Sequence, residues 1–265
     1  MTAVTTAFDK AKAEDRAALV GYLPAGYPDK DTAIKSALAM TEAGADLIEV
    51  GLPYSDPLMD GPVIADAVYQ SLRNGTRIAD VLDTVQAIAD AGTPAVVMTY
   101  WNPVDQYGVE AFARDLSNAG GSGLITPDLT PEESGDWPAV SDSYGLDRIF
   151  LVAPSSPEHR IEKITAASSG FVYAVSLMGI TGTREALSDA AAGLVSRTRV
   201  HTKLPVAVGV GVSNRTQAAE VAGFADGVIV GSAFVRALGG ASDGASAVQA
   251  VRELAAGLAQ GVRRQ

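Results

Sequence analysis

Two carboxyl groups in one stretch of the chain have the residue types and spacing for acid–base chemistry. Glu49 lies in the strand predicted over Asp46–Val50, among leucine, isoleucine and valine. Asp60 follows in a loop rich in proline, glycine and aspartate. Burial of an unpaired carboxylate is costly and raises its pKa, which suits a group that gives and takes a proton near neutral pH. Two carboxyl groups in different environments can divide the acid and base roles.

Each carboxyl group also has an ordinary structural explanation. Glu49 could be a structural acid satisfied by hydrogen bonds or by an arginine. Asp60 could cap or turn its loop, as loop aspartates usually do. We favour a catalytic pair because Glu49 is on the face expected to point into a barrel mouth, and because Gly61-Pro62 and other prolines would hold Asp60 in position.

The residues that are missing narrow the chemistry further. The two histidines, His159 and His201, lie near a helix start and before a strand, so a metal held by histidines is not expected. No lysine follows a predicted strand, which argues against a Schiff base, and the chain has no cysteine to act as a nucleophile. We therefore expect carboxylate acid–base chemistry, with no metal and no cofactor on this chain.

The elements that must position these groups are short apolar segments that alternate with helical patterns. The segments predict parallel strands buried on both faces. Thr130-Pro131-Glu132-Glu133 has the pattern of a capping box, and Ser156-Pro157-Glu158 is a similar helix start. Apolar residues at helical spacing predict helices over Asp31–Ala43 and Arg77–Ala91. The eight predicted strands are Ala18–Leu23, Asp46–Gly51, Ala95–Thr99, Gly123–Thr126, Arg148–Val152, Phe171–Ser176, Pro205–Gly209 and Gly227–Val230.

This alternation indicates an α/β fold, and eight strands in 265 residues fit a (β/α)8 TIM barrel. A doubly wound sheet is the alternative, disfavoured because no glycine-rich dinucleotide turn follows the first strand. An extra N-terminal helix over Phe8–Asp15 would close the barrel bottom. A short helix over Ala233–Leu238 would follow strand eight, and the last helix would run from Ser246 to Arg263. No linker divides the chain, so residues 1–265 are expected to form a single domain.

In such a barrel the chemistry sits at the carboxyl ends of the strands. Glycines gather at two neighbouring ends, Gly209-Val210-Gly211 and Gly231-Ser232, the second opening the short helix. Backbone N–H groups and a helix N-terminus favour a phosphate there, although such glycines could only make tight turns. The Gly179–Thr183 loop after strand six has the composition of a mobile lid, or of a passive connection. Other polar residues at strand ends are Tyr22, Thr99, Tyr100, Asn102, Thr126, Asp128, Tyr173 and Ser176.

Composition limits the partners. With 31 acidic and 20 basic residues the net charge is -11, and no basic patch is evident, so nucleic acid is not an expected partner. The hydrophobic fraction of 47% is too high for disorder. No signal-peptide pattern and no apolar run of membrane-spanning length is evident, so we expect a cytoplasmic protein without a membrane anchor.

Taken together, these motifs resemble the tryptophan synthase alpha chain family over nearly the whole chain. The most specific segment is Glu49–Pro62, a strand glutamate followed by a Pro-aromatic-Ser-Asp-Pro-Leu-x-Asp-Gly-Pro loop. Departures are mild: Tyr22 and Tyr54 stand where phenylalanine is common in the family, and Met59 where a small residue is common. Further matches in order are Pro24–Pro28, Met98–Pro103, Tyr173 with Gly179–Gly182, Gly209–Ser213 and Gly231–Ser232.

The resemblance implies a lyase that splits indole-3-glycerol phosphate into indole and glyceraldehyde 3-phosphate. Glu49 would protonate the indole carbon and take the side-chain hydroxyl proton, and Asp60 would stabilise charge at the indole nitrogen. Thr181 would fix Asp60 when the lid closes. The substrate would be bound by Tyr22, Met98, Tyr100, Tyr173, Thr181, Gly182, Gly211, Gly231 and Ser232.

The resemblance also implies a partner, a beta chain that carries the pyridoxal phosphate, in an alpha2beta2 heterotetramer. Asp56, Pro57, Asn102 and Pro103 match family positions that face it. Two alternatives stay open: a stand-alone lyase acting on the same substrate, and a non-catalytic phosphate-binding regulatory subunit. Activity without the beta chain would separate the first, and retention of both carboxyl groups argues against the second.

Overall fold

The computed structural model describes residues 2–175 and 184–263, with only the backbone of residues 184–187. Its strands form one continuous parallel sheet in the order β5-β4-β3-β2-β1-β9-β8-β7-β6, and this sheet is the wall of a TIM barrel. The predicted α/β barrel is therefore confirmed. The strands are β1 Ala18–Pro24, β2 Leu47–Gly51, β3 Ala95–Met98, β4 Gly123–Ile125, β5 Asp147–Ile149, β6 Leu151–Val152, β7 Val172–Val175, β8 Val206–Gly209 and β9 Gly227–Val230.

The barrel closes through a single residue of the chain. The predicted fifth strand is divided at Phe150 into β5, which pairs with β4, and β6, which pairs with β7. The carbonyl oxygen of Phe150 still accepts a hydrogen bond from the backbone N–H of Tyr173 at 3.1 Å, so Phe150 is bonded to β7 although it belongs to neither strand. The expectation of one uninterrupted strand over Arg148–Val152 was wrong, because the two halves follow different neighbours around the barrel.

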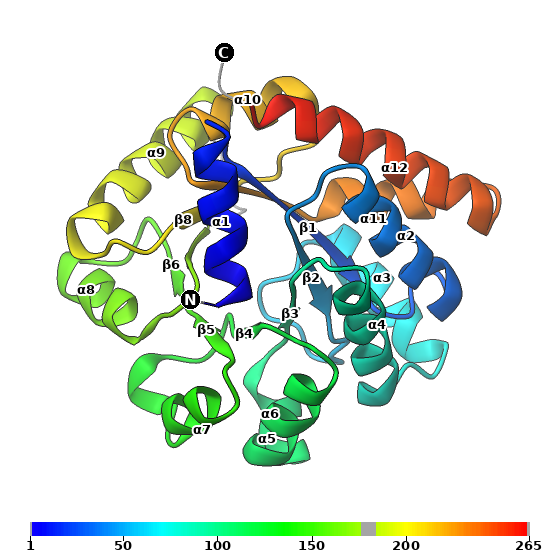
Figure 1. The fold of residues 1–265 in the computed structure, drawn as a ribbon, viewed down its shortest axis with the longest axis horizontal. Helices are drawn as coiled ribbons and strands as arrows, with labels where there is room; N and C mark the ends of the chain where they lie inside the picture. The colour runs from blue at the N-terminus through cyan, green and yellow to red at the C-terminus, as the bar shows by residue number, and fades with distance from the viewer. Residues whose placement is uncertain (1, 176–183, 264–265) are drawn as a thin grey trace.

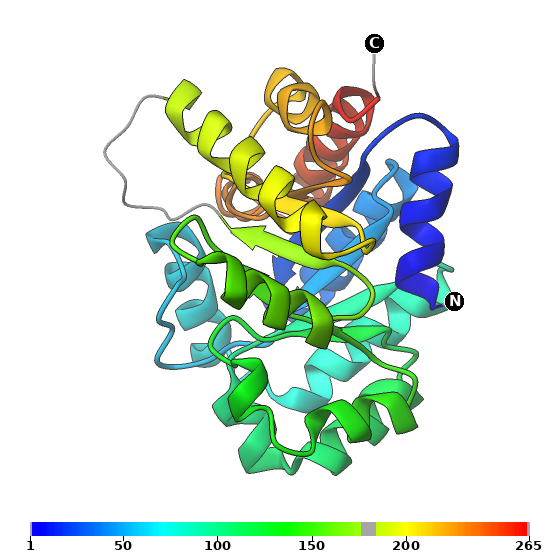
Figure 2. The same cartoon turned by 90° about the vertical axis from the view of Figure 1, so that its left-hand side faces the viewer.

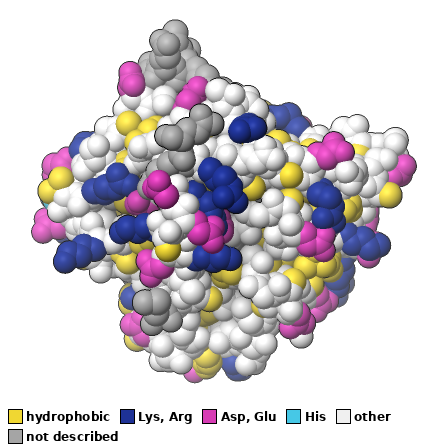
Figure 3. Space-filling view, turned by 45° about the horizontal axis from the view of Figure 1, so that its top comes forward, with side chains coloured by type: hydrophobic (Ala, Val, Ile, Leu, Met, Phe, Trp, Pro, Cys, Tyr) yellow, Lys and Arg dark blue, Asp and Glu magenta, His cyan; other side chains and the backbone are white. Residues whose placement is uncertain are grey.

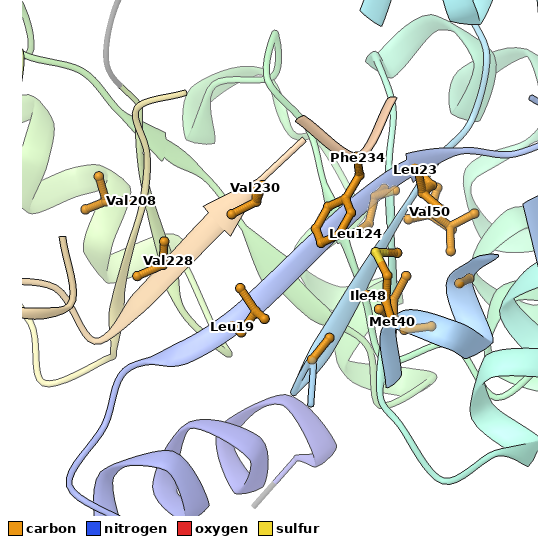
Figure 4. Packing of buried hydrophobic residues seen from close by; sticks show 14 of the residues in the cluster. Leu19, Leu23, Met40, Ile48, Val50, Leu124, Val208, Val228, Val230 and Phe234 are labelled. Atoms are coloured by element: carbon orange, nitrogen blue, oxygen red, sulfur yellow. The ribbon is translucent and has the colours of Figure 1, made fainter. Parts of the chain in front are cut away.

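Helices surround the barrel as an outer ring, visible from two directions in Figures 1 and 2. Strand residues that point outward pack against this ring, and Figure 4 shows part of that layer, with Ile48 beside Met40 and Leu23 beside Val50. The helices are α2 Lys30–Glu42, α3 Pro62–Arg73, α4 Ile78–Asp90, α5 Trp101–Tyr107, α6 Val109–Asn118, α7 Trp137–Ser143, α8 Glu158–Ala167, α9 Arg184–His201, α10 Arg215–Ala222, α11 Ser232–Gly239 and α12 Gly244–Gly261.

The N-terminal helix α1, Ala3–Ala13, closes one end of the barrel, as predicted. In Figure 1 it lies across the centre of the ring. Phe8 enters the barrel, where its ring is 5.3 Å from that of Phe171, and a Cβ atom at Gly227 would come within 2.8 Å of it. The helix starts at its Thr2 cap and ends at Ala13, not at Asp15, because the backbone of Asp15 is left-handed with φ 52°.

Two other predicted helix starts differ from the observed ones, and the capping side chains explain both differences. The last helix begins at Gly244, two residues before the predicted start, because Asp243 caps it by accepting a bond from Ser246 N. The capping-box pattern at Thr130 does not begin an α-helix. Its hydroxyl donates to the Glu133 carboxylate at 2.7 Å, and only a 3-10 turn, η1 Pro131–Glu133, forms.

The charged surface is mixed in sign. On the face shown in Figure 3, acidic and basic side chains are interspersed. Some form short ion pairs, such as Arg160 with Glu132 at 2.7 Å. Exposed pairs of this kind contribute little to stability. Among the helices within the described ranges, none combines the length and apolar character needed to cross a membrane.

Candidate active site

A cavity of about 510 Å³ opens at the carboxyl ends of the strands, the end of the barrel opposite α1. We call it the barrel-mouth cavity. It brings together most of the residues predicted from the sequence. The predicted residues on its wall are Tyr22, Glu49, Asp60, Met98, Tyr100, Tyr173, Gly211, Gly231 and Ser232.

Glu49 is the buried carboxyl group of this cavity. It lies on β2 in register with Tyr22 of β1, so both side chains point into the barrel. Glu49 is 1% exposed, and its Oε1 atom has no hydrogen-bond partner among the described residues. Burial raises its pKa to about 8, and no cation among the described side chains opposes the shift. The group is therefore mostly protonated at neutral pH and can act as an acid.

Asp60 is the second carboxyl group, and a tyrosine holds it. The Tyr100 hydroxyl, at the start of the segment after β3, donates to Asp60 Oδ1 at 3.2 Å and accepts a bond from Met59 N at 2.9 Å. Burial raises the pKa of Asp60, and the bond from Tyr100 opposes that shift. The two carboxyl groups thus occupy different environments, since Asp60 has a donor and Glu49 has none among the described residues.

Two tyrosines complete the inner wall, and each depends on a glycine. The Tyr22 hydroxyl lies against Gly51, where a Cβ atom would come within 2.5 Å of it. The Tyr173 hydroxyl lies against Gly209 in the same way, at 2.6 Å from a Cβ atom. Burial raises the pKa of both tyrosines well above its usual value, and the charge of Glu49 adds to the shift of each, together with Asp60 for Tyr22. Both phenols therefore stay protonated and can donate hydrogen bonds.

The predicted phosphate end follows β8 and β9, which lie between β7, the strand of Tyr173, and β1, the strand of Tyr22. Gly211 has φ +73°, a conformation that favours glycine, and among the described residues, apart from its two chain neighbours, none has an atom within 4 Å of a Cβ placed there. Gly231 is the N-cap of α11, and Ser232 is its first residue. Arg236 follows one turn later, with its guanidinium 3.4 Å from the Ser232 hydroxyl. Gly231 and Ser232 line the cavity, so the N-terminus of α11 can offer backbone N–H groups to an anion there.

The remaining predicted residues lie elsewhere. Thr181, Gly182 and the rest of the Gly179–Thr183 loop are outside the described residues. The predicted partner positions do not line the cavity but stand on its rim, in the loop after β2 and in α5, where Asp56 and Asn102 are exposed. Asp128 has a local role, since its carboxylate accepts the Trp101 N–H at 2.9 Å and begins α5. The rings of Trp101 and Trp137 are 6.0 Å apart at this rim.

Some cavity residues were missed by sequence reasoning. Ile64 and Val68 line the cavity from α3, a helix that was not predicted. Pro62 at the first helical position and the four-residue spacing of the two apolar residues would have indicated it. Tyr54 also lines the cavity, and its ring is 5.4 Å from that of Tyr100. It stands within the loop motif itself, but only the folded loop reveals its direction.

No group of three or more histidine, aspartate and glutamate side chains able to hold a metal ion occurs within the part of the chain that is described. The part of the cavity wall formed by residues 22–175 and 209–232 includes no lysine. The chemistry that this wall can offer is therefore proton transfer by carboxyl groups, hydrogen bonds from phenols, and anion binding by backbone N–H groups.

Comparisons with known proteins point to one family. A family model for the tryptophan synthase alpha chain matches residues 8–263. The tryptophan synthase alpha chain of Mycobacteroides abscessus is 59% identical over 261 residues, covering 98% of this chain and 97% of that protein. That of Thermobifida fusca is 58% identical over 266 residues, covering 99% and 98%.

Solved structures agree with this match. One structure of Mycobacterium tuberculosis tryptophan synthase has a TM-score of 0.92 at 54% identity, covering 99% of this chain and 98% of that one. Tryptophan synthase subunit alpha from Legionella pneumophila has a TM-score of 0.90 at 32% identity, covering 99% and 98%. On these grounds the chain belongs to the tryptophan synthase alpha chain family.

Proposed function

We propose that the barrel-mouth cavity cleaves indole-3-glycerol phosphate to indole and glyceraldehyde 3-phosphate, with Glu49 as the proton donor and acceptor. The family membership supports the reaction. The observation that carries the residue assignment is the Glu49 carboxyl group, buried beside the cavity, without a hydrogen-bond partner among the described residues, and with a pKa raised to about 8. Such a group holds a proton at neutral pH and can donate it to a substrate.

The proton balance of the reaction needs only one such group. Protonated Glu49 gives its proton to C3 of the indole, which leaves a carboxylate and a cationic ring. The carboxylate then takes the proton of the hydroxyl on the attached carbon. The bond from that carbon to C3 breaks, its electron pair returns to the ring, and the oxygen becomes the aldehyde. Glu49 ends protonated, and no metal or electron transfer enters the balance.

Asp60 would stabilise the charge on the indole ring. Its bond from Tyr100 favours the carboxylate form and fixes its direction at the cavity wall. A carboxylate beside the ring N–H would offset the positive charge that follows protonation of C3, an electrostatic effect that is strong where water is excluded. Thr181 lies outside the described residues, and its action on Asp60 stays a prediction.

The rest of the cavity suits the two ends of this substrate. Apolar and aromatic groups such as Met98, Tyr22 and Tyr173 would contact the indole and the carbons beside it. Gly231 and Ser232 at the start of α11, and Gly211 in the loop after β8, would bind the phosphate through backbone N–H groups. Gly182 is assigned to the same phosphate by the family resemblance alone.

A tryptophan synthase alpha chain works with a beta chain, and we infer that the rim of the cavity is the docking surface. Asp56, Pro57, Asn102 and Pro103 were assigned to it by resemblance. The loop of Asp56 and Pro57 also exposes two large apolar side chains, Leu58 at 79% and Met59 at 46%. Neighbouring exposed apolar side chains at a cavity entrance are typical of an interaction surface. We assign the pyridoxal phosphate to the beta chain, and a cytoplasmic location stays a prediction.

Replacement of Glu49 by glutamine tests the proposal, because it keeps the shape and removes the titrating proton. We expect turnover of indole-3-glycerol phosphate, measured as released glyceraldehyde 3-phosphate, to fall at least roughly 100-fold. Binding of an indole phosphate analogue, measured by calorimetry, should change little. Near-normal turnover in this variant would refute the assignment of Glu49.

The same assay with and without a beta chain separates the open alternatives. Slow turnover alone with strong acceleration by the beta chain is expected for an alpha chain whose site is completed by docking. Fast turnover alone would indicate a stand-alone lyase. Analogue binding without turnover under both conditions would indicate a regulatory subunit.

A further inference from the structure

The Tyr22 hydroxyl is a polar group at the reaction site for which the structure provides no hydrogen bond. The side chain is 6% exposed and lines the barrel-mouth cavity. No residue in the ranges 2–175 and 184–263 is recorded as a hydrogen-bond partner of this hydroxyl. Burial, and after it the charges of Asp60, Glu49 and Tyr100, raise the pKa of the phenol, which therefore stays protonated. A phenol on the cavity wall without a protein partner can donate a hydrogen bond to a group that enters the cavity.

The ring spans the wall between the two ends of the cavity. A Cβ atom at Gly231, the N-cap of α11, would lie 3.3 Å from Tyr22 Cδ1, so one side of the ring borders the phosphate end. The hydroxyl lies against Gly51, two residues beyond Glu49 on the same face of β2. The hydroxyl is therefore located above Glu49, at the carboxylate end of the cavity.

The order of strands in the sheet determines which part of the substrate lies next to Tyr22. Strand β1 lies between β2, which carries Glu49, and β9, which leads to Gly231. A substrate with its reacting carbon at Glu49 and its phosphate at the start of α11 must cross the end of β1. The inward side chain there is Tyr22. The first substrate atoms beyond Glu49 along this path are the hydroxyl-bearing carbons, not the indole.

We infer that the Tyr22 hydroxyl donates a hydrogen bond to the oxygen on the substrate carbon attached to the indole ring. It is a substrate-positioning residue in this role, and the inference rests on the function proposed above. The bond holds the hydroxyl proton toward Glu49. It persists as that proton leaves and the oxygen becomes the aldehyde, so the phenol keeps its own proton throughout. The phenol thereby recognises a hydroxylated side chain rather than any indole phosphate.

Tyr22→Phe removes only the hydroxyl, and two ligands show what the hydroxyl does. The first is indole-3-glycerol phosphate, for which we expect kcat/KM to fall about tenfold, the loss of one hydrogen bond. The second is indolylpropyl phosphate, which has the ring and the phosphate but neither hydroxyl. Its Kd should be unchanged or lower, since its binding to the wild type leaves the phenol unpaired. Tyr69→Phe, the same change at an exposed site on α3, is the control.

Each result bears on the inference in a defined way. A fall in kcat/KM with an unchanged Kd for the analogue supports the hydrogen bond and shows that the variant is folded. An equal loss of kcat/KM for the substrate and of affinity for the analogue would mean that the hydroxyl only shapes the cavity. No loss of either would mean that the hydroxyl has no role. Both results would overturn the inference. Absence of turnover by the wild type, with a beta chain present, would instead overturn the proposed function on which it rests.

Discussion

The burial of Glu49 should lower the stability of the folded chain in a way that depends on pH. The folded state raises the pKa of this group from 4.5 to about 8. Between these values the unfolded chain has lost the proton and the folded chain still holds it, so stability falls as pH rises. A span of about 3.5 units at about 1.4 kcal/mol each gives a destabilisation of about 5 kcal/mol at pH 8 and above, and roughly 3 kcal/mol at pH 7.

Glu49→Gln should therefore stabilise the chain at neutral and higher pH while it lowers turnover. The amide does not titrate, so its advantage over the wild type should be smallest below pH 4.5, where the carboxyl group is protonated in both states. It should grow by roughly 2–3 kcal/mol between pH 5.5 and 7.5. Burying the glutamine amide also changes the free energy of unfolding, but by an amount that does not depend on pH. The test is therefore how the difference in unfolding free energy between variant and wild type changes with pH.

Urea unfolding of the isolated chain at several pH values measures this slope. Glu162→Gln is the matched control, because Glu162 is exposed on α8, and the same substitution there should leave the free energy of unfolding nearly unchanged. If the difference between Glu49→Gln and the wild type were the same at pH 5.5 and 7.5, the carboxyl group would not be titrating with a raised pKa. The acid role drawn from its burial would then lose its physical basis.

Two further predictions concern opposite ends of the barrel. Gly211→Val forces a branched side chain onto a backbone with φ +73° at the phosphate end, and we expect KM for indole-3-glycerol phosphate to rise at least tenfold; an unchanged KM would remove the phosphate from this end. Phe8→Ala empties the contact with Phe171 inside the barrel, and thermal or urea unfolding should show a loss of about 3–5 kcal/mol, whereas a loss below 1 kcal/mol would mean that α1 only rests on the surface.

Much of the fold could be predicted because its strands are short and buried on both faces. Every residue of β1, β2 and β9 is buried, so their apolar runs carry the signal without any alternation. The division of the fifth strand at Phe150 could not be predicted, since it depends on which neighbour each half reaches around the barrel. The prediction of a helix start at Thr130 was wrong for a local reason, because the Thr130 hydroxyl bonds the Glu133 side chain instead of the backbone.

The site was predictable residue by residue but not in its contacts. Glu49 was evident because a carboxyl group in an apolar strand conflicts with its surroundings. The bond from Tyr100 to Asp60 was not evident, because it joins the loops that follow two neighbouring strands and depends on how both loops fold. The fit of the Tyr22 hydroxyl against Gly51 likewise becomes visible only when β1 and β2 are aligned in register.

The two tryptophans at the rim give the chain a built-in optical signal. They are the only tryptophans in the sequence, their rings are 6.0 Å apart, and Trp137 is 1% exposed while Trp101 is partly exposed. Trp101 directly follows Tyr100, which holds Asp60. Fluorescence excited at the red edge of the indole band therefore arises from one rim location. A partner that covers this rim would change the tryptophan emission, so assembly could be followed by fluorescence titration without an attached dye.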